Sequence, residues 1–355
     1  MTAIETLIQQ TKQGDAILIT SDVNRRYLSH FNSSAGAILI CNTHAYLFLD
    51  FRYREMGEVA KTRGIIPSVV TIEDAASFAN LKRICERHGI KKLFFEDCRM
   101  TCSELNEYKN ALCNIEFEPL ANRIELFRVS KTPEELNKIR AAQALTEEAF
   151  LHVLTCFNDH ITETELAAEI DCYFRRRGAE NAFETILVSG AHTSLPHGKP
   201  ENIPLHKNGF VTMDFGAKVD GYCSDMTRTV VFGKATDEMR NLYNLVLDAQ
   251  NAAFATIRAG ITGKAVDAAA RDLINAAGFE GCFEHGTGHS LGLEIHESPN
   301  FNARGLTPIP AGAVLSVEPG VYLTGKYGVR IEDIVCVTEN GYENLTHAKK
   351  ELLEL

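Results

Sequence analysis

Apolar and polar positions alternate most regularly in the run FVTMDF, residues 210–215. This period of two is typical of a strand with one buried face. Gly216 ends the run, and Asp220-Gly221 has the composition of a tight turn. A second run follows over residues 222–232 and ends in the β-branched segment TRTVVF. The pattern predicts a hairpin of two short strands here.

The first 125 residues alternate short apolar runs with helical patterns. Residues 74–88 carry apolar side chains at helical spacing, and Gly89 follows as a stop signal. Strands that alternate with helices predict a small α/β domain with a mixed or parallel sheet. Four apolar runs are expected to supply strands of this sheet: residues 16–20, 36–40, 45–50 and 93–96.

The remainder of the chain, residues 126–355, combines long helical patterns with strands that we expect to be antiparallel. Two helix starts are marked by capping boxes, in which a threonine is followed three residues later by a glutamate: Thr132 with Glu135 and Thr162 with Glu165. Amphipathic spacing predicts two further helices over residues 237–258 and 264–277. Further strands are expected at residues 185–189, 313–317 and 328–338.

Length and charge narrow the classes of protein. A chain of 355 residues exceeds what one core usually holds, so two domains are expected. The formal net charge of −11 argues against a nucleic-acid partner, which would favour a basic surface. No apolar run reaches the length of a membrane span, and the N-terminus lacks a basic region followed by an apolar one. We therefore expect no membrane partner and a cytoplasmic location.

The ten cysteines are scattered and form no CxxC pair. Cys98 and Cys102 are the closest pair, and without histidine partners this spacing is a weak zinc signal. The cysteines are instead predicted to be small buried hydrophobic residues in a reducing compartment.

Four carboxylates and one imidazole stand in or beside strand-like or glycine-rich segments of the second half. They are Asp214, Asp225, His289, Glu318 and Glu332. Four carboxylates that converge near a core would repel one another or become protonated. Two divalent cations would neutralise them, and a bridging hydroxide would complete the set. A ligand set of mostly oxygen with one nitrogen favours Mn²⁺, with Co²⁺, Fe²⁺ or Zn²⁺ as alternatives.

The segments MDFGAKVDGYCSDMTRT, HGTGHSLGLEIHESP, LSVEPGVY and GVRIED resemble the motifs of the pita-bread metallopeptidases. Within that family the best match is the Xaa-Pro branch, aminopeptidase P and prolidase. The resemblance begins near Thr132, and the preceding part is similar in size and placement to a creatinase-type N-domain. It implies an α/β and α+β fold class: a creatinase-like N-terminal domain over residues 1–125 and a pita-bread catalytic domain over residues 126–355.

The resemblance also implies how the five residues divide between two metal ions. Asp214 matches the aspartate that holds one metal. Asp225 and Glu332 match the two bridging carboxylates. His289 and Glu318 match the ligands of the other metal.

Four residues match catalytic positions of the family. Glu318 matches the general base as well as a metal ligand. His197 and His296 match two histidines that contact the substrate and stabilise the tetrahedral intermediate. Arg330 matches a basic residue near the bridging carboxylates and the substrate. Taken alone, the two histidines would be read as surface or capping groups and Arg330 as a structural ion-pair partner.

The implied activity is that of an Xaa-Pro aminopeptidase, in which a metal-bridging hydroxide cleaves the bond before a proline. Prolidase, an Xaa-Pro dipeptidase, is the alternative. Dipeptidase-type relatives often carry a basic residue soon after the His-Glu pair, whereas residues 298–301 are uncharged here and the nearest cation is Arg304. Proline-containing peptides are the expected partners, and the resemblance implies a homodimer.

Three rivals share this fold. Methionine aminopeptidase usually lacks a preceding domain of this size, and creatinase has altered ligand positions, whereas all five ligand positions are filled here. A non-catalytic relative that binds partners would typically have lost ligands and gained charged tails. Neither feature is present in this sequence.

Overall fold

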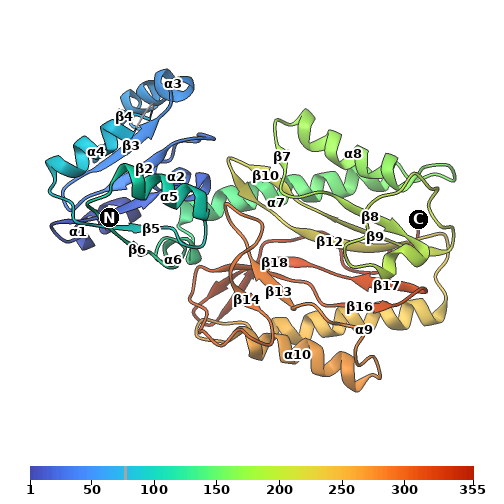
Figure 1. Cartoon of the computed structure of the whole chain (residues 1–355). Helices are drawn as coiled ribbons and strands as arrows, with labels where there is room; N and C mark the ends of the chain where they lie inside the picture. Colours follow the sequence, from blue (N-terminus) through green and yellow to red (C-terminus); the bar gives the residue numbers. More distant parts are fainter. Residues whose placement is uncertain (76–77) are drawn as a thin grey trace. The chain divides into compact units, whose positions relative to one another are not determined.

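The computed structural model describes residues 1–75 and 78–355 (Figure 1). The chain separates into two units, Met1–Phe127 and Arg128–Leu355, each with its own hydrophobic cores. Within the described ranges, no helix combines the length and apolar character needed to cross a membrane.

The N-terminal unit is built on one six-stranded mixed sheet in the order β4-β3-β2-β1-β5-β6. The central strand β1 pairs antiparallel with β2 and parallel with β5. The predicted mixed sheet is therefore present, and two strands were not foreseen, β4 and β6. The six strands are β1 Asp15–Ile19, β2 Ala37–Ile40, β3 Ala45–Leu49, β4 Val70–Asp74, β5 Lys92–Phe95 and β6 Glu116–Pro119.

Helices cover both faces of this sheet because successive strand residues point to opposite sides. Ile17 and Ile19 of β1 pack in one core with helices α1 (Ala3–Gln10), α2 (Asp22–Ser29) and α3 (Phe51–Thr62). Ala16 and Leu18 pack on the other side in a core shared with α4 (Phe78–Arg87) and α5 (Cys102–Ala111). A short helix, α6 (Glu125–Val129), spans the boundary between the units.

Two expectations for this half of the chain were wrong in detail. The helix predicted over residues 74–88 begins only at Phe78, because Asp74 ends strand β4; residues 76–77 of that prediction lie outside the described part. The cysteines are not uniformly buried. Only four are, and another four are exposed, because they lie on helix surfaces or turns: Cys98, Cys102, Cys113 and Cys172.

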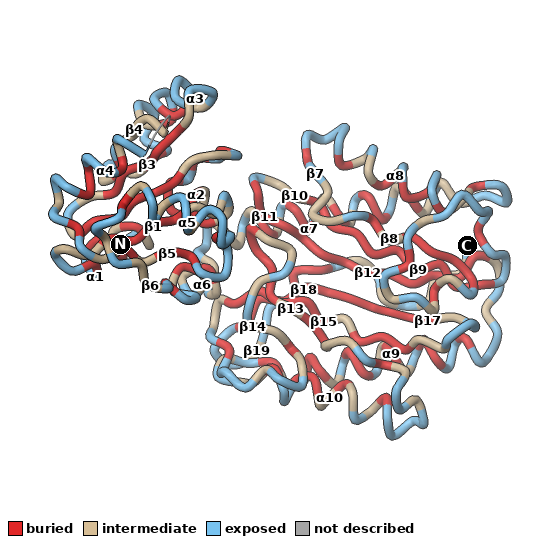
Figure 2. The backbone as a smooth tube through the Cα atoms, viewed as in Figure 1, coloured by how far each residue is buried: buried red, intermediate tan, exposed pale blue. Residues whose placement is uncertain are grey.

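The C-terminal unit places its strands between two pairs of helices (Figure 1). Helices α7 (Pro133–Leu154) and α8 (Glu163–Arg176) lie on one side, and α9 (Asp237–Phe254) and α10 (Gly263–Ala276) lie on the other. Both predicted capping boxes are formed, at Thr132 and at Thr162. The helices bury their strand-facing sides and expose their outer sides (Figure 2).

Every strand pair of this unit is antiparallel, as expected. A three-stranded sheet β12-β9-β8 packs against α7 and α8, and a five-stranded sheet β14-β13-β15-β18-β19 packs against α9 and α10. The bounds in these two sheets are β8 Ile186–Ser189, β9 Gly209–Phe215, β12 Met226–Phe232, β13 Gly288–Ser290, β14 Glu297–Phe301, β15 Val314–Val317, β18 Asp333–Thr338 and β19 Gly341–Asn344. The smaller elements are β7 Glu180–Asn181, β10 Ala217–Val219, β11 Tyr222–Cys223, β16 Gly320–Leu323, β17 Tyr327–Arg330 and the 3₁₀ helix η1 Gly190–Ser194.

The predicted hairpin is present but is divided. Asp220 and Gly221 form its turn with positive φ angles of 47° and 79°, as a tight two-residue turn requires. The turn joins the short strands β10 and β11, whereas the long strands β9 and β12 pair with each other beyond them. Strand β9 is buried on both faces, not on one, because the polar face of its alternating pattern turns into the site described below.

The single strand predicted over residues 328–338 is in fact two strands, β17 and β18. Ile331 and Glu332 separate them, where the chain passes from the β16–β17 pair to the five-stranded sheet. The backbone N–H of Glu332 donates to the carbonyl of Thr227 in β12. This crossover aims the Glu332 side chain between the two larger sheets.

The two helix pairs follow one plan that the sequence did not reveal. Thr162 caps α8 and pairs with Pro204, and Thr262 caps α10 and pairs with Pro308. Each of the two helices is followed by a glycine with positive φ, Gly178 and Gly278. The helices and strands thus form two similar halves that face each other.

Candidate metal centre

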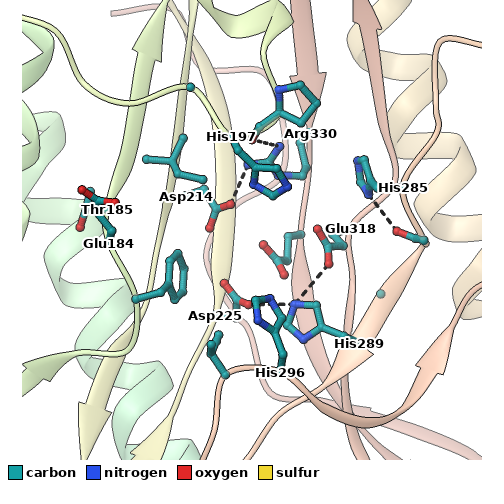
Figure 3. Close-up of a pocket in the computed structure, with 18 of the residues that line it drawn as sticks. Glu184, Thr185, His197, Asp214, Asp225, His285, His289, His296, Glu318 and Arg330 are labelled. Atoms are coloured by element: carbon teal, nitrogen blue, oxygen red, sulfur yellow. Dashed lines mark hydrogen bonds and ion pairs between the residues drawn. The ribbon is translucent and has the colours of Figure 1, made fainter.

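A cavity of about 500 Å³ opens between the two halves of the C-terminal unit. All eight residues singled out from the sequence line this cavity, and all of them except Glu332 are labelled in Figure 3. They come from segments far apart in the chain: Asp214 from β9, Asp225 from the link before β12, His289 from β13, Glu318 from the segment after β15, Arg330 and Glu332 from the end of β17 and the crossover that follows, and His197 and His296 from loops.

Close backbone contact holds the strand that carries His289. A Cβ atom built on the neighbouring Gly288 would lie 1.9 Å from the carbonyl oxygen of Ser316, so only glycine lets β13 approach β15 this closely. The Ser316 hydroxyl accepts from the backbone N–H of His289 at 3.0 Å and donates to Oε1 of Glu318 at 3.1 Å. One serine therefore fixes the relative placement of both residues.

The imidazole of His289 lies between two carboxylates. Its Nε2 atom is 3.5 Å from Oδ2 of Asp225 and 3.4 Å from Oε1 of Glu318. Its Nδ1 atom donates to the carbonyl of Ser290 at 3.2 Å, which leaves Nε2 with a free lone pair in the neutral ring. Burial lowers the pKa of His289, and this favours that neutral form.

Three buried carboxylate oxygens have no hydrogen-bond partner among the described residues. They are Oδ1 of Asp214, Oδ1 of Asp225 and Oε1 of Glu332. Ligand atoms of Asp225, His289 and Glu332 also lie within 4.8 Å of one another. A buried oxygen without a partner costs free energy, and a bound cation would remove that cost. The donor set therefore fits divalent metal ions.

Without a cation, the site disfavours full ionisation. Burial raises the pKa of Glu318 to about 7. The pKa of Asp225 is raised mainly by burial and next by the negative charge of Glu332. The pKa of Glu332 is raised mainly by burial and next by the negative charge of Glu318. Divalent ions reverse this effect because they stabilise the ionised carboxylates.

Arg330 is the buried cation of the site. Its Nη2 donates to Oδ2 of Asp214 at 2.6 Å, and its Nε donates to the Thr227 hydroxyl at 3.1 Å. Its Nη1 donates to the hydroxyl of Tyr322 at 2.7 Å and to the carbonyl of Pro196 at 3.2 Å. Arg330 is therefore held from four sides, in one orientation, against Asp214.

Two residues of this network were missed by the sequence analysis. The hydroxyl of Tyr322 accepts from Arg330 and lies 2.9 Å from Nε2 of His285, so Tyr322 connects these two residues. Thr227 donates to Oε2 of Glu332 at 2.7 Å while it accepts from Arg330. Thr227 lies opposite Asp214 in the pairing of β9 with β12. That position would have identified Thr227 as a residue of the site, but the pairing can be known only from the structure.

The two histidines proposed to contact the substrate are exposed at the cavity. The His296 ring packs edge-on against His289, with centroids 4.5 Å apart (Figure 3). Burial lowers the pKa of His296, in spite of its exposure, and the neutral ring can donate from one nitrogen. His197 lies across the cavity beside Asp214 and Arg330 (Figure 3).

A buried glutamate, also missed from the sequence, holds the segment that carries His197. The Glu163 carboxylate accepts from the backbone N–H of Ser189 at 2.6 Å and from that of Glu201 at 3.0 Å. It also lies 3.0 Å from Nδ1 of His192. Both ends of the segment are thereby tied to the start of α8. The sequence had identified this region only as a helix start.

Comparison with known proteins places the chain in a family. Residues 137–339 match Metallopeptidase family M24, and residues 6–130 match the Creatinase/Prolidase N-terminal domain. An uncharacterized peptidase of Bacillus subtilis is 39% identical over 96% of each chain.

Solved structures agree with this match. The chain is similar to an Xaa-Pro dipeptidase from Bacillus anthracis, with a TM-score of 0.93 and 36% identity, and to an X-Pro aminopeptidase from Thermotoga maritima, with a TM-score of 0.91 and 33% identity. Each comparison covers 99% of both chains. The predicted fold class, a creatinase-like domain followed by a pita-bread domain, is confirmed. The chain therefore belongs to metallopeptidase family M24.

Proposed function

We propose that the chain is an Xaa-Pro aminopeptidase, which hydrolyses the bond between an N-terminal residue and a following proline. The observation that carries this proposal is the convergence of four carboxylates and one imidazole in a cavity that also holds two exposed histidines. Relatives of the whole chain are named for action on Xaa-Pro bonds. The nitrogen of such a bond carries no hydrogen, so it needs a dedicated enzyme.

We assign two divalent ions to Asp214, Asp225, His289, Glu318 and Glu332, with Asp225 and Glu332 as the shared ligands. The oxygen-rich donor set favours Mn²⁺ over Co²⁺, Fe²⁺ or Zn²⁺. When bound, such ions polarise a carbonyl group and lower the pKa of water. Arg330 neutralises the oxygen of Asp214 that it contacts and leaves the other oxygen available.

Glu318 is proposed to take the proton of the attacking water and to return it to the leaving nitrogen. A general base must lie within reach of the water that it activates, and the Glu318 carboxylate lines the cavity, 3.4 Å from Nε2 of His289. The Ser316 hydroxyl holds one oxygen of Glu318. The other oxygen is then the one that moves the proton.

His296 and His197 are proposed to donate hydrogen bonds to the oxygen that becomes negative during the reaction. Both line the cavity, one on each side of the carboxylates (Figure 3). Hydrogen-bond donors accelerate the chemical step when they bind the transition state more strongly than the ground state.

We propose a preference for peptides longer than two residues, because the cations near the cavity are poorly placed to bind the carboxylate of a dipeptide. A dipeptide ends in a carboxylate that needs a cation. Asn300, which lines the cavity after the His-Glu pair, is neutral, and Arg304 is exposed and does not line it. Arg330 is already occupied on four sides. These features support an open site.

A dipeptidase is the second candidate, favoured by one residue. Lys199 lines the cavity, and its Nζ pairs with Oε2 of Glu184 at 2.9 Å, both side chains being 75% exposed. An exposed pair of this kind is weak, so Lys199 could turn towards a dipeptide carboxylate.

The ratio of kcat/KM for Ala-Pro-Ala and Ala-Pro separates the two candidates. We expect the tripeptide to be preferred and Lys199→Ala to leave both values within about twofold. A preference for the dipeptide of about tenfold or more, which is abolished in Lys199→Ala and kept in Lys207→Ala, would make the protein a dipeptidase. Lys207 is a suitable control because it forms a similarly exposed ion pair, with Asp159.

We also propose that residues 1–125 and 126–355 are separate domains and that the protein works in the cytoplasm. A homodimer is proposed as its assembly. All ten cysteines are free, which suits a reducing compartment. Independent cores in the two parts support the domain division.

A further inference from the structure

A second group of metal-binding side chains lies between helices α7 and α8, and none of its members lines the cavity. It consists of His152 in the last turn of α7, Cys156 in the turn that follows, and Glu169 in α8. One ligand atom from each lies within 4.8 Å of the other two. All three side chains are only partly buried, so a solvent ion can reach them.

The separations between these atoms match those around a tetrahedral zinc ion. Nε2 of His152 is 3.2 Å from Oε2 of Glu169 and 3.9 Å from Sγ of Cys156. Typical zinc bond lengths and tetrahedral angles place such a nitrogen about 3.3 Å from an oxygen ligand and about 3.6 Å from a sulfur ligand. The two separations that involve His152 are therefore within a few tenths of an ångström of those around zinc, and the sulfur and oxygen atoms lie within 4.8 Å of each other.

The imidazole is already held in the orientation that this site needs. Its ring stacks on Tyr173, with centroids 5.0 Å apart and an interplanar angle of 27°. Tyr173 is in turn fixed, because its hydroxyl donates to Glu148 at 3.2 Å and the guanidinium of Arg177 lies over its ring at 3.7 Å. Less side-chain entropy is therefore lost when an ion binds.

The charge of the site also suits a divalent cation. A thiolate and a carboxylate together balance two positive charges, and the neutral imidazole adds none. The group lies at the C-terminal end of α7, where the helix dipole favours cations. Three protein ligands leave a fourth position open to water.

From these observations we propose that His152, Cys156 and Glu169 form a separate binding site for one zinc-class divalent ion, which links the end of α7 to α8. A thiolate with an imidazole selects softer ions than the oxygen-rich cavity does. This site is independent of the proposed peptidase activity, since it shares no residue with the cavity.

The test is a titration of the full-length protein with CoCl₂ in a non-thiol reductant, followed by near-ultraviolet absorption. Cobalt bound to a thiolate gives a charge-transfer band, and the cavity offers no sulfur ligand. We expect the band to level off at the intensity of one thiolate-bound Co²⁺ per chain, in addition to any Co²⁺ that the cavity takes up without a band. Cys156→Ser should abolish it, and Glu169→Gln, which keeps the thiol, should weaken the affinity by about tenfold or more.

Cys172→Ser is the matched control, because Cys172 is an exposed cysteine of α8 outside this group. It should leave the band and the affinity unchanged. The proposal is overturned if saturating Co²⁺ gives no band in the unmodified protein, if the band survives in Cys156→Ser, or if Glu169→Gln binds as tightly as the unmodified protein. Far-ultraviolet circular dichroism establishes that each variant is folded.

Discussion

Asp225 is the residue whose loss should affect the proposed metal centre most directly. Its Oδ2 faces His289, and its buried Oδ1 has no hydrogen-bond partner among the described residues. We propose Asp225 as a ligand that two ions share, and a neutral amide in its place should weaken the binding of both.

We predict that Asp225→Asn loses at least one of two metal ions and that its activity falls by orders of magnitude. Elemental analysis of the purified variant, together with its rate on an Ala-Pro peptide, provides the measurement. Asp220→Asn, at the tip of the β10–β11 turn, is the control and should keep both ions. Two retained ions and full activity in Asp225→Asn would refute the assignment.

His296→Ala should keep the metal ions but lower kcat by about 10²–10³, the usual effect of removing one hydrogen-bond donor to an oxyanion. The physical reason is that His296 contacts the ring of the proposed ligand His289 but is itself exposed to substrate. Metal content and kcat, measured on the same sample, distinguish the two roles. A variant that loses metal would instead make His296 a ligand.

At the scale of elements, a buried ion cluster joins the start of the C-terminal unit to strand β14. Glu297 accepts from Arg128 and lies 3.1 Å from Nζ of Lys131. Burial alone would raise the pKa of Glu297, but Lys131 and Arg128 more than offset this and lower it. The ionised form of Glu297 is therefore favoured by folding.

This pKa shift has a definite sign for stability. The pKa of Glu297 is lower in the folded protein than in the unfolded chain, where it is about 4.3. Ionised Glu297 therefore adds to the free energy of unfolding above that pH, and this stabilisation is lost as the pH falls through the pKa of the folded protein. We predict that Glu297→Gln costs about 3 kcal/mol of unfolding free energy at neutral pH, since it takes the carboxylate away from buried Lys131 and leaves Arg128 paired with Glu294 alone.

Urea denaturation over a series of pH values measures this effect. The difference between Glu297→Gln and the unmodified protein should shrink as the pH falls below about 4.3. Glu343→Gln is the control, because Glu343 pairs with Arg140 in an exposed position and should change stability by less than about 1 kcal/mol. A difference for Glu297→Gln that does not depend on pH would contradict the account.

Elements fixed by local signals were the ones predicted best from the sequence. The capping boxes at Thr132 and Thr162 mark helix starts through bonds within four residues. The break between β17 and β18 was missed, because it depends on two sheets that meet there and not on the residues around Glu332.

The same limit applies to the site. Motif spacing indicated which carboxylates to group, and the structure brings them to one cavity. Tyr322 was missed because its partner His285 lies 37 residues before it, and Glu163 was missed because its partner His192 lies 29 residues after it. A single apolar pattern carries no information about such partners.

At the scale of the whole molecule, helix α3 exposes apolar side chains that a monomer would leave in water. Met56 is 60% exposed and Val59 is 45% exposed, and the two lie one helical turn apart on the same side of α3. Exposed apolar groups that lie close together often mark an interface with another chain.

We predict a homodimer, with light scattering giving twice the chain mass of 39.3 kDa. The double variant Met56→Glu/Val59→Glu should shift the mass to that of one chain, because it places charge in the apolar contact. Leu151→Glu, an exposed apolar position on α7, should not. A mass near 39.3 kDa for the unmodified protein would reject the dimer.

The central claim is that this cavity cleaves the bond before a proline with the help of divalent ions. The most direct measurement compares Ala-Pro-Ala with Ala-Ala-Ala as substrates of the Mn²⁺-reconstituted protein, with release of free alanine as the readout. We expect alanine to be released from Ala-Pro-Ala at a kcat/KM at least about a hundredfold higher than from Ala-Ala-Ala, and the rate to disappear after chelation. Equal cleavage of the two peptides, or no cleavage of Ala-Pro-Ala, would contradict the claim.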